Sequence, residues 1–199
     1  MKSDITTTLQ AVDRVLGGSS LTPLQRQYLH VYRRHSLSEV AGHIAKIFEP
    51  GMMVDEPHYR IQFRKSLVEL KGRAAVRNFY ESVGGAVILH ENQEIHLSDH
   101  SFTYYSTLVH HVTGAQLIAL GEAVDPKGYY VRRSEGSVAL WKFDNLGRLM
   151  GEFGSEVNPE IIQIPVDEFV TPQEARDKLT PLIAPLPEFN PEHSTSRKR

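Results

Sequence analysis

The sequence predicts an α+β domain in which N-terminal helices pack on one face of a curved, mostly antiparallel sheet. Apolar residues recur with a helical period in the first third of the chain, and mostly with a period of two after it. Proline is concentrated at the other end, since seven of the eleven prolines lie from Pro159 onward. We therefore expect a helical extension over residues 1–21, the α+β domain over 22–158, and an extended arm with a mobile polar tail over 159–199.

Three helices are expected before residue 50. The first carries Leu9, Val12 and Leu16 on one face. The second begins at a capping box, in which the Thr22 side chain and Gln25 cap each other's backbone. A similar pattern over residues 36–39 predicts the start of a third helix.

Two further helices are expected later in the chain. Inward-facing positions spaced by three and four residues predict a helix over 73–83. Within the arm, Thr171 followed by Pro172 resembles a helix start, and predicts a short helix near residues 171–179. The intervening segments alternate apolar and polar residues and predict strands over 52–59, 86–97, 101–113, 129–143 and 149–157.

The composition excludes several classes of protein. There are 22 basic and 24 acidic residues, so the net charge of −2 disfavours a nucleic-acid binder that relies on positive charge. The absence of cysteine excludes disulfides, thiolate metal sites and cysteine nucleophiles. No apolar run reaches the ~18 residues of a membrane helix, and the first residues lack the apolar segment of a secretory signal. We expect a cytoplasmic protein without membrane attachment.

No motif for a metal or a nucleotide cofactor is found in the sequence. Ten histidines are present, but their spacings do not match metal-ligand patterns. The glycines do not form a phosphate-binding loop. We therefore expect no cofactor and no metal, and treat four histidines as candidate acid–base or binding groups: His35, His58, His110 and His111.

A curved sheet closed by helices leaves an interior that suits a small apolar ligand. Strand alternation would place Glu56, His58 and Arg60 on its inner face, where a desolvated carboxylate could move a proton. The alternative for Glu56 is an edge-strand charge that faces water. Tyr32 could donate a hydrogen bond to a substrate oxygen, or could be an ordinary core aromatic.

The order of several motifs resembles the NTF2-like superfamily, in its branch of SnoaL-like polyketide cyclases and ketosteroid isomerases. The resembling segments are Ile47-Phe48-Glu49-Pro50, Val54-Asp55-Glu56-Pro57, residues 72–80 and residues 143–158. The resemblance implies a cone-shaped fold, a general base at Glu56, an oxyanion-binding tyrosine at Tyr32 and a supporting tyrosine at Tyr80. The chain departs from the pattern at Ala139, where the isomerases have a protonated aspartate.

The resemblance implies a cofactor-independent lyase, dehydratase or isomerase for an apolar ring-bearing molecule, with elimination of water or formaldehyde as one form. Candidate catalytic residues are Glu56, Tyr32, His58 and His35. Candidate substrate-binding residues are Arg60, Tyr59, Tyr80, Tyr104, His110, Trp141 and Glu152. The alternatives are an epoxide hydrolase, a polyketide cyclase, and a non-catalytic binding module. A homo-oligomer, dimer or trimer, is expected.

Overall fold

The computed structural model describes residues 2–63, 66–83 and 86–190, so the predicted tail at 193–199 lies outside the described residues. The main helices are α1 (Gln10–Leu16), α2 (Pro23–Val40), α3 (Ile44–Ile47), α4 (Arg73–Val83), α5 (Gly114–Ala119) and α6 (Pro172–Leu179). Short 3-10 helices are η1 (Ile5–Thr7), η2 (Val166–Glu168) and η3 (Thr180–Leu182). The strands are β1 (His58–Phe63), β2 (Ser66–Lys71), β3 (Val87–Leu97), β4 (Ser101–Thr113), β5 (Tyr129–Phe143), β6 (Leu149–Ser155) and β7 (Glu160–Ile164).

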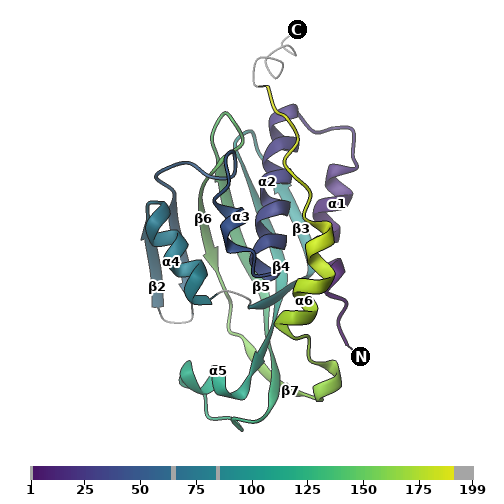
Figure 1. Ribbon diagram of the computed structural model, residues 1–199, viewed down its shortest axis with the longest axis vertical. Coiled ribbons are helices and arrows are strands. Elements are labelled where there is room, and N and C mark those ends of the chain that lie inside the picture. Colours follow the sequence, from purple (N-terminus) through teal and green to yellow (C-terminus); the bar gives the residue numbers. More distant parts are fainter. Residues whose placement is uncertain (1, 64–65, 84–85, 191–199) are drawn as a thin grey trace.

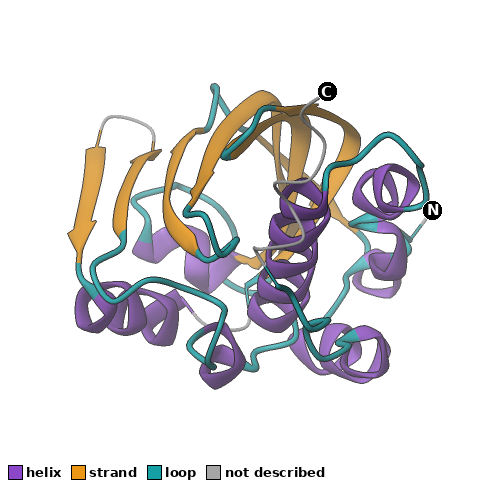
Figure 2. Ribbon diagram, turned by 90° about the horizontal axis from the view of Figure 1, so that it is seen from above, coloured by secondary structure: helices purple, strands orange, loops and turns teal. Residues whose placement is uncertain are grey.

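Seven strands form one strongly curved sheet, which is seen edge-on in Figure 2. The strand order is β2-β1-β6-β5-β4-β3, and β7 pairs with the free part of β5. All pairs are antiparallel except β1 with β6. Register shifts in β3 and β5 bend the sheet, because a bulge adds a residue to one strand. The predicted α+β fold with a curved, mostly antiparallel sheet is confirmed.

Helix α2 lies across the inner face of this sheet and brings its buried side chains to the core (Figure 1). Its start is fixed by the predicted capping box at Thr22 and Gln25. The Tyr28 ring stacks on Phe143 at 4.8 Å between ring centroids, and Tyr32 meets Phe102 edge-on at 4.7 Å. These aromatic contacts fix the rotation of α2 against the sheet.

Two predicted elements start at the wrong residue. The third helix was expected to start at residues 36–39, but α2 continues through them to Val40 and buries Ser36 and Ser38, and the separate helix α3 begins only at Ile44. Ser36 and Ser38 are therefore inside a helix rather than at a cap. The expected strand at 52–59 is mostly loop, and β1 begins only at His58.

Besides the short 3-10 helices, three of the described helices and strands were not predicted. They are β2, α5 and β7. Helix α5 had a readable signal, because Thr113 and Gln116 form a capping box at its start. Strand β7 lies between Pro159 and Pro165, and pairs with one neighbour only, which is the position that flanking prolines allow.

The N-terminal extension and the C-terminal arm both pack on the domain (Figure 1). Ile5, Leu9 and Val12 of the extension are fully or almost fully buried. Helix α6 of the arm buries Ala175 and Leu179, and starts at Thr171 as predicted, with the Thr171 side chain as its cap. Among the described residues, no helix is both long and apolar enough to cross a membrane.

Candidate active site

Three adjacent strands place a row of polar side chains on the inner face of the sheet. Trp141 of β5 lies directly opposite Glu152 of β6. On the other side of β6, Arg60 pairs with Phe153 in parallel register, so the preceding residues, Tyr59 and Glu152, are neighbours. Tyr59 and Trp141 are 0% and 3% exposed, which shows that the row faces the interior.

Helices α2 and α4 bring a second group of polar side chains to this row. His35 and Glu39 are one turn apart on α2, with 3.9 Å between His35 Nε2 and Glu39 Oε2. Tyr80 of α4 shares a hydrogen bond with His35, with 2.9 Å between the Tyr80 hydroxyl and His35 Nε2. Ring contacts join the two groups, since His35 lies 5.0 Å from Trp141 and Tyr80 lies 6.2 Å from Tyr59.

The two carboxyl groups of this region, Glu39 and Glu152, have pKa values near neutral pH. Burial raises the pKa of Glu39 to about 7. Burial, and after it the charge of Glu39, raise the pKa of Glu152 to about 8. Desolvation disfavours the ionised form of a carboxyl group. Two neighbouring carboxyl groups also do not both ionise easily, because their negative charges repel each other. Glu39 nevertheless keeps 23% of its side chain accessible, so part of this side chain reaches solvent.

The remaining polar groups of the site are neutral. Burial lowers the pKa of His35 to about 3, so its imidazole carries no charge at pH 7. Burial raises the pKa of Tyr59 and of Tyr80 well above the usual range. Each of these groups can therefore give or accept a hydrogen bond without bringing a formal charge into the interior.

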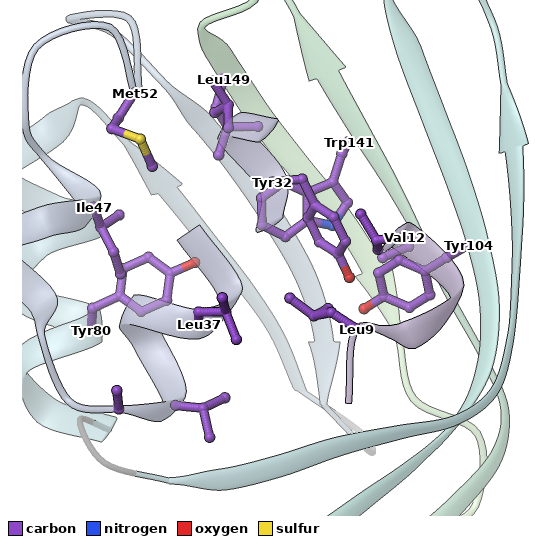
Figure 3. Close-up of a cluster of buried hydrophobic side chains, with 14 of the residues drawn as sticks. Leu9, Val12, Tyr32, Leu37, Ile47, Met52, Tyr80, Tyr104, Trp141 and Leu149 are labelled. Carbon is purple, nitrogen blue, oxygen red and sulfur yellow. The ribbon is translucent and has the colours of Figure 1, made fainter. Parts of the chain in front are cut away.

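An aromatic wall closes one side of the site. Tyr32 contacts Trp141 edge-on at 4.8 Å and lies 6.2 Å from Tyr104, and its hydroxyl accepts a hydrogen bond from Gln93 at 3.1 Å. In Figure 3 these three aromatic residues lie together, opposite Tyr80 and Ile47. Burial raises the pKa of Tyr32, so its hydroxyl stays protonated at neutral pH.

The expected position of Glu56 on the inner face is wrong. Glu56 is exposed and lies in a bend before β1, with its carboxylate beside Gly72. The predicted strand placed it by alternation, but β1 starts two residues later. Its side chain therefore faces water, which is the alternative that the sequence left open.

His58 and Arg60 also differ from expectation. His58 pairs with Glu69 at 2.8 Å and meets Phe153 ring to ring on the outer side, while Arg60 is exposed. Because side chains alternate along a strand, the buried Tyr59 between them takes the inner face.

Six of the other candidates are buried around α2, Glu152 beside them is half-buried, and one belongs to a different cluster. The six are Tyr32, His35, Tyr59, Tyr80, Tyr104 and Trp141. His110 instead lies 3.2 Å from Glu156, whose carboxylate also holds the Arg132 guanidinium. That ion pair fixes the chain after β6 to β5.

Glu39 is the functional candidate that sequence reasoning missed. It was attributed to the cap of a separate third helix. The available signal was its spacing of four residues from His35, which places both on one face of a continuous helix.

A shallow pocket between the end of α2 and α6 is lined by Ala41, Gly42, Pro172, Gln173 and Arg176, and includes none of the groups above.

Solved structures share this arrangement of helices and sheet. A protein assigned as a SnoaL-like polyketide cyclase from Shewanella putrefaciens CN-32 aligns with a TM-score of 0.52 and 10% identity, over 73% of this chain and 87% of its own. An NTF2-like protein of unknown function from Burkholderia xenovorans LB400 aligns with a TM-score of 0.46 and 12% identity, over 70% and 88%. This chain has the NTF2-like fold.

The epoxide hydrolase/cyclase-like enzyme SalBIII, from pyran ring formation in salinomycin, aligns with a TM-score of 0.45 and 15% identity, over 67% of this chain and 91% of its own. No family model and no curated protein matches the sequence. Likeness at these identities establishes the fold, and the chemistry must be argued from the site.

Proposed function

We propose that this protein is a cofactor-independent acid–base enzyme for an apolar, ring-bearing molecule, acting as a lyase, dehydratase or isomerase. The observation that supports the proposal is the pair Glu39 and Glu152, two desolvated carboxyl groups whose pKa values are raised to about 7 and about 8. A catalytic acid or base is most effective when its pKa lies near the working pH. The aromatic wall around Tyr32 and Trp141 suits a ring.

The pair can divide the two roles of acid and base. Near pH 7 to 8, Glu39 gives up its proton first and can remove one from the substrate, while Glu152 keeps its proton and can donate it. The His35 and Tyr80 pair borders Glu39 and can orient it or a substrate oxygen. Elimination and double-bond migration both need this transfer of one proton in and one proton out.

The first test is substitution of each carboxyl group. We expect Glu39→Gln and Glu152→Gln each to lower kcat at least ~100-fold with ligand binding retained, because an amide cannot exchange protons at these positions. The assay is a panel of ring-bearing ketones, β-hydroxy ketones and aryl epoxides, followed by proton NMR in D₂O for exchange, elimination or opening.

Two exposed glutamates serve as comparisons. Glu94→Gln is the matched control, since 70% of the Glu94 side chain is exposed. Glu56→Gln tests the general base that the sequence predicts against the buried pair Glu39 and Glu152. Loss of turnover in Glu56→Gln with normal turnover in Glu152→Gln would remove the buried pair from the mechanism.

The same pair also suits the opening of an epoxide by water. A carboxylic acid at Glu152 can protonate the epoxide oxygen while a carboxylate at Glu39 activates water. Turnover in labelled water distinguishes the reactions, because hydrolysis incorporates the label and elimination does not. Ligand binding without any turnover across the panel would favour a non-catalytic binding module.

The expected homo-oligomer and the expected cytoplasmic location of this protein stay predictions.

A further inference from the structure

The ring-bearing side chains of the candidate site are closed off from solvent. None of the following five is more than 3% exposed: Tyr32, His35, Tyr59, Tyr80 and Trp141. Protein interiors are densely packed, and a ring-sized molecule does not pass between side chains that stay in place. A ring-bearing ligand can therefore reach these groups only if an element of the fold moves aside.

Two helices bring side chains to the site, and they differ in how firmly they are packed. Helix α2 buries eleven of its 18 residues, whereas α4 buries only Val76 and Tyr80 among its 11. Helix α4 lies at the β2 edge of the molecule, on the side away from the arm (Figure 1). Because elements with few buried contacts open at a lower free-energy cost than the core, α4 is the helix that can leave the site.

The N-terminal half of α4 is anchored to the chain that precedes β1. The Arg73 guanidinium donates to the Met53 carbonyl oxygen at 3.2 Å and to the Phe48 carbonyl oxygen at 2.5 Å. The Arg77 guanidinium lies 4.2 Å from the centroid of the Phe48 ring. Immediately before the helix, Gly72 has a φ of +81°, a conformation that favours glycine. This half of α4 has the contacts of the fixed end of a hinge.

The C-terminal half of α4 is joined to the site through Tyr80. Tyr80 is the buried residue of this half, and residues 81–83 after it are exposed. The Tyr80 hydroxyl and His35 Nε2 share a hydrogen bond of 2.9 Å, and the two rings meet edge-on at 5.2 Å. One hydrogen bond between neutral groups shifts an equilibrium by about 3- to 10-fold, so this contact can hold the helix closed and still open.

We propose that α4 is a hinged lid over the candidate site, anchored at Arg73 and latched by the Tyr80–His35 hydrogen bond, and that its opening admits the ring-bearing ligand. The proposal rests on the function proposed above and adds the route by which the ligand enters. Opening breaks the hydrogen bond and exposes the interior beside His35. Closing returns Tyr80 to His35 and excludes water from the acid–base groups.

The single tryptophan reports the opening without any substitution. The Trp141 indole N–H is buried and has no hydrogen-bond partner among the described residues, so its exchange in D₂O depends on solvent that reaches it. We expect this exchange, followed by ¹⁵N NMR on the full chain, to be nearly independent of urea below the unfolding transition, because a lid exposes little surface when it opens. The backbone amides of β5 are the internal control, and urea should speed their exchange through global unfolding.

An isosteric variant tests the latch. Tyr80→Phe should speed exchange of the Trp141 indole N–H about 3- to 10-fold and change the amides of β5 less than about 2-fold. Tyr105→Phe is the matched control, since Tyr105 is 47% exposed. Leu182→Ala loosens the arm instead of α4, and should leave the indole exchange within about 2-fold of wild type.

Several results would overturn the lid. They are an indole N–H with the urea dependence of the β5 amides, equal acceleration of the indole and these amides in Tyr80→Phe, no acceleration in Tyr80→Phe, or acceleration in Leu182→Ala alone. Because exchange needs no substrate, these results are separate from the proposed function. Local opening without turnover across the substrate panel would leave the lid standing and overturn the acid–base enzyme, and turnover that depends on Glu152 without local opening would overturn the lid alone.

Discussion

The two interior carboxyl groups differ from the exposed Glu56 in environment rather than in type. Glu39 and Glu152 are desolvated by the sheet, α2 and the surrounding aromatic residues, while Glu56 lies in water at a bend. Desolvation is what raises a carboxyl pKa toward neutrality. The same residue type therefore serves as a proton carrier at one position and as a surface charge at another.

The titration of this pair predicts the pH dependence of catalysis. We expect kcat against pH to form a bell with its maximum between pH 7 and 8, because the reaction needs one carboxylate and one carboxylic acid. The alkaline limb should disappear from the residual activity of Glu152→Gln, which has no proton to lose there. A profile that is flat from pH 6 to pH 9 contradicts the assigned roles.

At the level of elements, the row of Tyr59, Glu152 and Trp141 depends on how closely β1 approaches β6. Gly151 makes this possible, since a Cβ atom at that position would lie 1.9 Å from the His58 carbonyl oxygen. The His58 backbone cannot move aside as the end of a flexible side chain could. The parallel pairing of β1 with β6, and with it the position of Tyr59 beside Glu152, needs glycine at residue 151.

Substitution at two glycines of β6 tests this close approach. We expect Gly151→Ala to destabilise the protein by about 3 kcal/mol or more, because the new methyl group overlaps backbone. Gly154→Ala is the matched control, where a Cβ would make ordinary contacts of 3.6 Å or more, and its change should stay within about 1 kcal/mol. Urea unfolding measures both, and equal effects would refute the argument.

At the scale of the whole molecule, the arm is joined to the sheet through a buried histidine. The Val170 backbone N–H donates to His111 Nδ1 at 3.1 Å, and the His111 ring packs against Phe169. Nδ1 can accept only while it is unprotonated. Burial, followed by the charge of Lys2, lowers the pKa of His111 to about 4.

This histidine predicts that acid weakens the docking of the arm. A folded-state pKa of about 4, below the ordinary ~6.5, means that unfolding takes up a proton between these values, so stability is complete above pH 6.5 and falls toward pH 4. Wild type should lose about 1.4 kcal/mol per pH unit relative to His111→Gln in that window. The buried carboxyl groups act in both proteins and cancel from the difference.

Urea unfolding at several pH values provides the comparison. His96→Gln is the control, because 70% of the His96 side chain is exposed. If wild type and His111→Gln lost stability in parallel between pH 6.5 and pH 4, the buried histidine would have no part in the acid sensitivity.

Much of the fold could be predicted because its signals are local. The periods of apolar residues gave α4, β4 and β5 with their observed bounds, and the capping box at Thr22 gave the start of α2. The site could be predicted only in part. Trp141 and Glu152 were found by their strand positions, and Tyr32 and Tyr80 by the family resemblance. Glu56, His58 and Arg60 were placed on the wrong face by a strand start that was set too early.

The sequence by itself determined the helix and strand periods, the caps and the absence of cysteine chemistry, because these depend on neighbours in the chain. Only the tertiary structure decided which glutamates are desolvated. Burial of a carboxyl group depends on atoms from α2, α4, β1, β5 and β6 together, and no local pattern specifies how those elements meet. The acid–base pair is therefore a property of the assembled cone, formed by residues that lie more than a hundred positions apart.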